Sequence, residues 1–143
     1  MKKILIIIPV LFSFFLFANV QSIKQEGTGI NFFKGTWQEA VAKAKKEKKH
    51  IFLDISASWC GPCKMLKRNT FTNAEVGKFY NDNFVCVEVD GEVGEGFELA
   101  QRFQIDGYPS LIYLDKNDKL ILKTAGYRAP ADFIGLGKHA IEK

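Results

Sequence analysis

The sequence has 143 residues, of which 47% are hydrophobic and 25% charged, a length and balance typical of one globular domain rather than a disordered chain. The formal net charge of +4 is too small to indicate a nucleic-acid-binding surface. One hydrophobic core of moderate size is therefore expected, and nucleic acid is not expected as a partner.

The N-terminal segment has the layout of a secretory signal peptide. Lys2 and Lys3 precede an apolar run from Ile4 to Ala18. This run is shorter than the roughly 20 residues that a membrane-spanning helix needs, so removal is favoured over retention as an anchor, and the cleavage position stays open. We predict a signal peptide over residues 1–22, an exported, periplasmic protein, and a mature domain over residues 23–143.

A capping box and an apolar stripe predict the first helix. Thr36 is followed three residues later by Glu39, the pattern in which each side chain caps the other's backbone N–H. Apolar residues then recur at helical spacing from Trp37 to about Lys48. The next segment, His50 to Ser56, is short and almost continuously apolar, which is typical of a strand buried on both faces.

The middle of the chain continues with alternating helical and strand patterns. The predicted elements are a helix from Cys63 to Phe71, a helix around Ala74 to Tyr80, a strand from Phe84 to Val89, a glycine-rich loop from Gly91 to Gly96 and a helix from Phe97 to Phe103. The loop lacks the pattern of a phosphate-binding loop. The strand, the helices and the next strand together predict a βαβ unit.

The last third of the chain predicts a hairpin and a final helix. Ser110 to Leu114 and Leu120 to Thr124 are strand-like, and Asp115 to Asp118 between them favours a hairpin turn. Pro130 suits the first turn of a helix that reaches Ile141. The element order indicates an α/β fold: one domain with a central mixed sheet flanked by helices, in which a βαβ unit precedes an antiparallel hairpin and a C-terminal helix.

Two cysteines lie at the junction between the first strand and the helix that follows it. Only two residues separate Cys60 from Cys63, so the sulfurs can bridge, and the N–H groups of a first helical turn stabilise a thiolate. Cys60, on the loop side, is predicted to be the exposed attacking nucleophile, and Cys63 the residue that resolves the mixed disulfide. A structural staple across so small a loop would contribute little chain-entropy stabilisation, which favours redox chemistry.

One hexapeptide resembles the active-site motif of the thioredoxin family. It reads Trp59-Cys60-Gly61-Pro62-Cys63-Lys64. The resemblance extends from about Trp37 to Lys143 and includes Asp54, Tyr108-Pro109 and Gly126. It implies a thioredoxin-like fold, thiol-disulfide oxidoreductase activity on protein disulfides, and no cofactor other than the Cys60–Cys63 pair itself.

The resemblance also implies a role for each matching position. Asp54 corresponds to a buried acid that helps to deprotonate the resolving cysteine, and burial raises a carboxyl pKa into the range of a general base; the alternative is a core residue without a role. Tyr108-Pro109 corresponds to a cis-proline site, although a trans bond is the commoner form before proline. The catalytic residues are then Cys60, Cys63 and Asp54. The substrate-binding residues are Trp59, Gly61, Pro62, Tyr108 and Pro109.

The two residues between the cysteines bear on the direction of electron flow, since they help to set the stability of the thiolate. Gly61-Pro62 resembles the reducing thioredoxins, whereas oxidising members tend to carry a histidine there. The resemblance therefore implies a monomeric reductase that a membrane thiol-electron transporter recharges, with cytochrome c precursors, disulfide isomerases or other exported proteins as clients. An oxidase or isomerase role is the alternative.

The chain departs from the family at one position and leaves two rival functions to weigh. Cys86 stands where thioredoxins commonly have a lysine beside the buried acid, so the proton path need not be the same; we expect an inert buried thiol, with a paired form left open. Metal binding is one rival, but neither His50 nor His139 is placed as the second half of a zinc motif, so no metal is expected. A binding module without catalysis is the other, and it would need neither both cysteines nor the acid.

Overall fold

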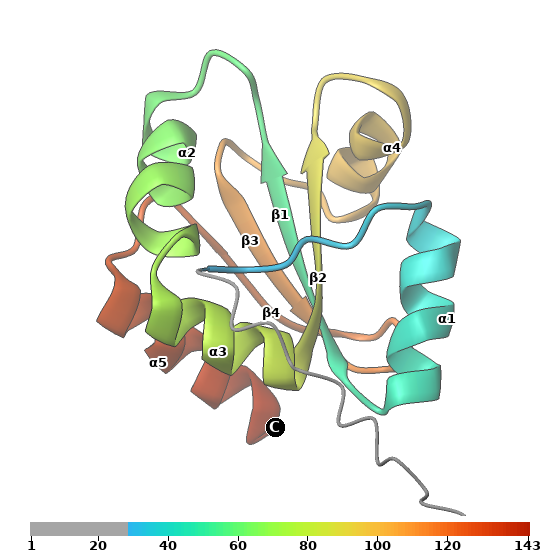
Figure 1. The fold of residues 1–143 in the computed structure, drawn as a ribbon. Coiled ribbons are helices and arrows are strands. Elements are labelled where there is room, and N and C mark those ends of the chain that lie inside the picture. The colour runs from blue at the N-terminus through green and yellow to red at the C-terminus, as the bar shows by residue number, and fades with distance from the viewer. Residues whose placement is uncertain (1–28) are drawn as a thin grey trace, which may run out of the picture.

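A four-stranded sheet lies between two layers of helices in the computed structural model, which describes residues 29–143 (Figure 1). The strands are β1 (His50–Ser56), β2 (Phe84–Asp90), β3 (Ser110–Leu114) and β4 (Leu120–Ala125). The helices are α1 (Trp37–Glu47), α2 (Gly61–Met65), the π-helix η1 (Leu66–Phe71), α3 (Ala74–Asn83), α4 (Gly94–Arg102) and α5 (Pro130–Ile141). This confirms the predicted α/β class. The predicted signal peptide lies outside the described residues.

The strand order is β2-β1-β3-β4. It brings three chain segments together at one end of the sheet, where β1 and β2 have their carboxyl ends. Strands β1 and β2 are parallel, with Ser56 opposite Asp90 at their carboxyl ends. Strand β3 runs antiparallel to β1 and begins beside the same end, where Ser110 faces Ile55. Three segments therefore meet at this end of the sheet: the loop after β1, the loop after β2 and the segment before β3.

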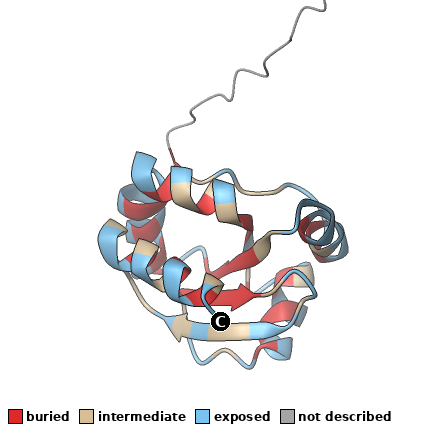
Figure 2. Ribbon diagram, turned by 90° about the horizontal axis from the view of Figure 1, so that it is seen from below, coloured by how far each residue is buried: buried red, intermediate tan, exposed pale blue. Residues whose placement is uncertain are grey.

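The strands in the middle of the sheet are buried (Figure 2), and the side chains of β1 contribute to two core clusters, one on each face of the sheet. Ile51, Leu53 and Ile55 are fully buried in the layer beneath α1 and α4. Phe52 points to the opposite face, where its ring lies 5.2 Å from that of Tyr80 and is covered by η1, α3 and α5. Each such buried side chain contributes about 1.5–3 kcal/mol through removal from water, and β1 contributes to both layers because its residues alternate between faces.

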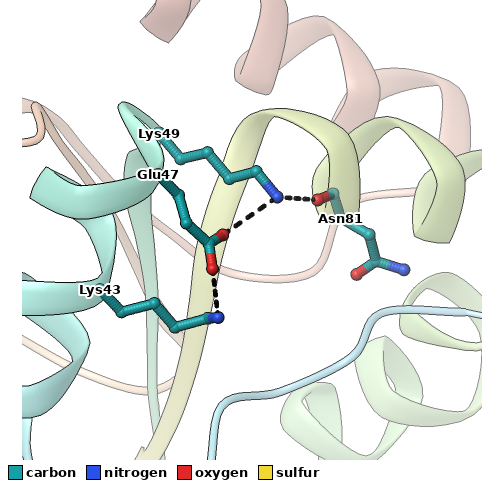
Figure 3. Close-up of polar contacts among 4 residues, drawn as sticks. All are labelled: Lys43, Glu47, Lys49 and Asn81. Carbon is teal, nitrogen blue, oxygen red and sulfur yellow. Dashed lines mark hydrogen bonds and ion pairs between the residues drawn. The ribbon is translucent and has the colours of Figure 1, made fainter. Parts of the chain in front are cut away.

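The first helix begins and ends as its sequence predicts. The Thr36 hydroxyl accepts from the Glu39 N–H at 3.3 Å, and the Glu39 carboxylate accepts from the Thr36 N–H at 2.8 Å, which confirms the capping box. After the helix, Lys49 Nζ donates to the Asn81 carbonyl oxygen at 2.8 Å and lies 3.4 Å from Glu47 Oε2, while Glu47 also pairs with Lys43 (Figure 3). These contacts join the start of β1 to α3. They lie at the end of β1 opposite the cysteines.

Helix α4 corrects one boundary that the sequence suggested. It begins at Gly94, within the segment predicted to be a loop, and the predicted start at Phe97 was wrong. Packing requires a glycine at position 96 of this helix, because a Cβ on Gly96 would lie 1.9 Å from the Asp90 carbonyl oxygen. Gly96 thus lets the first turn of α4 approach the end of β2 closely.

The helix predicted from Cys63 to Phe71 changes its winding on the way. It is α-helical up to Met65 and π-helical from Leu66 to Phe71. The wider turn brings Leu66, Thr70 and Phe71 to the buried side, a set that α-helical winding would spread further around the axis. Within residues 29–143 no helix has both the length and the hydropathy required to cross a membrane.

Candidate active site

Cys60 and Cys63 form a disulfide at the beginning of α2, with their Cα atoms 5.3 Å apart. Cys60 is the N-cap of the helix, and the Cys63 backbone N–H donates to Cys60 Sγ at 3.1 Å. A backbone N–H directed at this sulfur favours the thiolate form of Cys60 once the disulfide is reduced. Pro62 occupies the opening turn, where its missing N–H is not needed.

Neither cysteine is open to solvent, since each is only 2% exposed. The prediction that Cys60 faces solvent is therefore wrong for the disulfide-bonded state. The partly buried side chain of Tyr108 packs against the cluster formed by Ala57 and the two cysteines, and so contributes to this cover. The Tyr108 ring also meets the ring of Trp59 edge to face, with centroids 5.8 Å apart. Any molecule that reacts with the sulfur of Cys60 must therefore first displace part of this cover.

The residues predicted to bind the substrate surround the disulfide. Gly61 and Pro62 are exposed, Tyr108 is half-buried and Pro109 is buried. The Tyr108–Pro109 peptide bond, expected to be cis, is cis. The Pro109 carbonyl accepts from the Gly126 N–H at 2.9 Å, and Gly126 has a φ of 89°, a backbone conformation that favours glycine. The structure thus places these residues together at the end of the sheet where β1 ends and β3 begins.

Asp54 lies on the inner part of β1 with 1% exposure, and its Oδ1 has no hydrogen-bond partner among the described residues. Burial, and secondarily the negative charge of Glu88, raises its pKa to about 8, while Lys67 acts in the opposite direction. Glu88 lies directly across from Asp54 on the neighbouring strand β2. Its Oε1 accepts a hydrogen bond from Lys67 Nζ at 2.8 Å. An acid with this pKa is a usable proton acceptor near neutral pH.

Sequence reasoning missed Glu88, Lys67 and Glu92. The first two form the ion pair beside Asp54, and Glu92 accepts a hydrogen bond from Trp59 Nε1 at 3.0 Å. A charged residue within the apolar run of β2 was a usable signal for Glu88. No pattern marked Glu92, because its contact with Trp59 depends on how the loop after β2 folds back towards the cysteines.

The third cysteine is separate from this site. Cys86 is free and 2% exposed. Burial raises its pKa well above the ordinary thiol range, so it carries little thiolate and is expected to be unreactive. In the part of the chain that the structure describes, no group of three or more histidine, cysteine or acidic residues is arranged to hold a metal ion.

The Tyr108 ring occupies space that is free because residue 91 is a glycine. A substitution at Gly91 therefore tests how firmly this ring is packed. A Cβ at Gly91 would lie 2.7 Å from Tyr108 Cε1 and 2.7 Å from Ile55 Cγ2. Gly91→Ala should therefore displace the ring and lower the free energy of unfolding by about 1–3 kcal/mol, as measured by urea denaturation. The matched control is Gly107→Ala, where a Cβ meets nothing within 4 Å. Equal stability of the two variants would show that the ring does not need this space.

The comparisons with known proteins agree with this geometry. A family model described as thioredoxin-like matches residues 33–116. Spermatogenesis-associated protein 20 of Mus musculus is 51% identical over 55 residues, which are 38% of this chain and 7% of that protein. The thiol:disulfide interchange protein DsbD of Colwellia psychrerythraea is 31% identical over 101 residues, which are 67% of this chain and 16% of that protein. The chain therefore spans only a small part of the length of these relatives.

Among solved structures, the solution structure described as that of a "putative disulphide-isomerase" from Bacteroides thetaiotaomicron has a TM-score of 0.72 and 30% sequence identity. The match covers 82% of this chain and 97% of that one.

Proposed function

The chain belongs to the thioredoxin-like family, and we propose that it reduces disulfide bonds of exported proteins by dithiol-disulfide exchange through Cys60 and Cys63. One observation carries the proposal: the two cysteines form a disulfide at a helix N-terminus, with a backbone N–H directed at Cys60 Sγ. A purely structural disulfide would not need to lie at a helix N-terminus. It would also not need a buried acid such as Asp54 on the strand that leads to the cysteines.

The first step of the proposed cycle is attack by the Cys60 thiolate on a client disulfide. A bond forms between Cys60 Sγ and one client sulfur, the client disulfide breaks, and the other client sulfur leaves as a thiolate. The Cys63 N–H, 3.1 Å from Cys60 Sγ in the disulfide state, supports the charge of the attacking thiolate before the bond forms. Trp59, Gly61, Pro62, Tyr108 and Pro109 are the proposed docking residues.

The second step is attack by Cys63 on Cys60 Sγ. The Cys63 thiol first loses its proton, for which Asp54 is the proposed acceptor because its pKa of about 8 lies near the pH of the reaction. The Cys60–Cys63 bond then forms, and the second client sulfur leaves as a thiolate. Two electrons have passed from the protein to the client, and the disulfide seen in the structure is the product.

The cycle requires a donor of two electrons, for which we propose a membrane thiol-electron transporter. Support comes from the likeness to DsbD, a thiol:disulfide interchange protein. The proposed export to the periplasm is supported by Lys2, Lys3 and the apolar run after them. The 30% identity with the chain described as a "putative disulphide-isomerase" makes isomerisation the second candidate.

Reduction of insulin by dithiothreitol, followed by turbidity, tests the proposed activity. We expect the protein to accelerate precipitation and the double variant Cys60→Ala/Cys63→Ala to leave the uncatalysed rate. Cys86→Ala is the matched control, since it also removes a buried thiol but should keep the acceleration. If the double variant accelerates as well as the wild type does, the cysteine pair is not the source of the activity.

A further inference from the structure

The cover over the disulfide raises the question of how a client reaches Cys60. Trp59 is 66% exposed, so burial does not hold it in place. Its indole N–H instead donates to Glu92 Oε1 at 3.0 Å, and its ring rests on that of Tyr108. The hydrogen bond from Trp59 to Glu92 therefore holds the Trp59 ring against Tyr108, which packs on the two cysteines. We call this hydrogen bond the latch.

Two carboxylates, those of Glu92 and Asp90, lie on the turn that carries this latch. The Glu92 N–H donates to Asp90 Oδ1 at 2.9 Å, which places the two acids on one short turn, and neither forms a salt bridge within residues 29–143. Burial raises the pKa of the Tyr108 hydroxyl, and the negative charges of Glu92 and Asp90 raise it further. Two negative charges therefore act on the Tyr108 side chain that packs against the two cysteines.

Apolar side chains lie next to these acids. Val93 follows Glu92 directly and is 63% exposed, and Phe97 is 50% exposed. The Phe97 N–H donates to the Val93 carbonyl at 3.2 Å, so the two side chains stand on adjoining turns where α4 begins. Figure 1 shows that this turn and the loop leading to α2 leave the sheet at the same end. The surface beside the disulfide is thus both acidic and apolar.

We propose that this surface selects client segments in which a lysine or arginine and an apolar residue flank the reacting cysteine. The client cation binds the Glu92 carboxylate in place of the indole N–H, Trp59 is released, and Cys60 becomes accessible. The exchange is favourable because it replaces a hydrogen bond from a neutral donor to the Glu92 carboxylate with a salt bridge, which adds the attraction between two opposite charges. The apolar residue of the client packs on Val93 and Phe97. The proposal rests on the reductase function proposed above.

Three peptides that differ in one residue test the proposal. Each contains the same internal disulfide and the same apolar residue, with Lys, Gln or Glu beside the attacked cysteine. For the wild type we expect kcat/KM to fall in the order Lys, Gln, Glu, with about a tenfold difference between the Lys and Glu peptides at low salt and a smaller one at 1 M salt, where exposed charges are screened.

Two substitutions at Glu92 separate its charge from its role as a latch. Glu92→Gln keeps an oxygen that accepts from Trp59 but removes the charge, so the preference for the Lys peptide should collapse. Glu92→Ala removes both, and in addition the neutral reductant dithiothreitol should reduce the Cys60–Cys63 disulfide faster than in the wild type. Glu98→Gln, an equal loss of charge at an exposed position of α4, should keep the peptide preference.

The outcomes separate this proposal from the one on which it rests. Equal rates for the three peptides with the wild type, or an unchanged preference in Glu92→Gln, would overturn the selection by Glu92. An equal loss of preference in Glu98→Gln would replace it with a general effect of net charge. A wild type that reduces none of the peptides, the Gln peptide included, would instead contradict the reductase function.

Discussion

Cys63→Ser is expected to convert the protein into a trap for its clients. Cys60 can still attack a client disulfide, but without the second thiol the mixed disulfide is not resolved, so turnover should fall to the uncatalysed rate while a covalent complex accumulates. The complex should appear on non-reducing gels after incubation with oxidised insulin and disappear on addition of dithiothreitol.

The reciprocal variant provides the control for this trap. Cys60→Ser keeps Cys63, which lies inside the first turn of α2 whereas Cys60 is its N-cap, so it should form no complex. Should Cys60→Ser trap clients as efficiently as Cys63→Ser, the assignment of attacking and resolving roles would have to be reversed.

Asp54→Asn is expected to stabilise the oxidised protein increasingly as the pH rises. In the folded state burial raises the pKa of Asp54 from 3.8 to about 8, whereas in the unfolded chain it ionises near its ordinary value. The wild type therefore loses stability between about pH 4 and pH 8, because the unfolded state releases a proton that the folded state retains. Asparagine has no such proton, so the variant should gain at most about 4 kcal/mol at pH 7, at ~1.4 kcal/mol per pKa unit.

Urea denaturation of both proteins at several pH values measures this gain. Asp106→Asn, at an exposed position, controls for the loss of one acidic residue. A difference in the free energy of unfolding that stays constant from pH 4 to pH 8 would contradict the raised pKa of Asp54.

The same variant should also slow the catalytic cycle. Loss of the proton acceptor is expected to lower the rate at which Cys63 resolves the mixed disulfide by roughly 100-fold, the lower end of the usual contribution of a general base. The rate is measured as the decay of a preformed mixed disulfide between Cys60 and a coloured thiol, which isolates the second step. The effect should diminish at high pH, where the thiol of Cys63 ionises without help. An unchanged decay rate at pH 7 would exclude Asp54 as the acceptor.

Much of the fold could be predicted because its signals are local. The capping box at Thr36, the apolar run of β1 and the turn at Asp115 each act within a few residues. Asp115 illustrates this: its side chain accepts from the N–H groups of Asn117 and Lys119, which closes the hairpin turn that the sequence predicts. Local interactions of this kind recur in similar sequences whatever the rest of the fold.

The errors have the opposite character, since each depends on parts of the chain that are distant in sequence. The early start of α4 depends on the close approach of Gly96 to β2. The burial of Cys60 involves Tyr108, which the segment before β3 brings against the two cysteines. The latch at Glu92 depends on Trp59, which comes from a different loop. No periodicity or motif records such contacts, because they arise only when the strands are paired.

The equilibrium of the Cys60–Cys63 pair with glutathione tests the central claim most directly. The fraction of reduced protein is measured by thiol alkylation and mass spectrometry over a series of glutathione ratios. A reductase should give a single two-electron transition at a potential well below that of glutathione, near the value of about −270 mV typical of thioredoxin. A transition above the glutathione potential would indicate an oxidase, and a pair that does not exchange with glutathione at all would contradict the proposed chemistry.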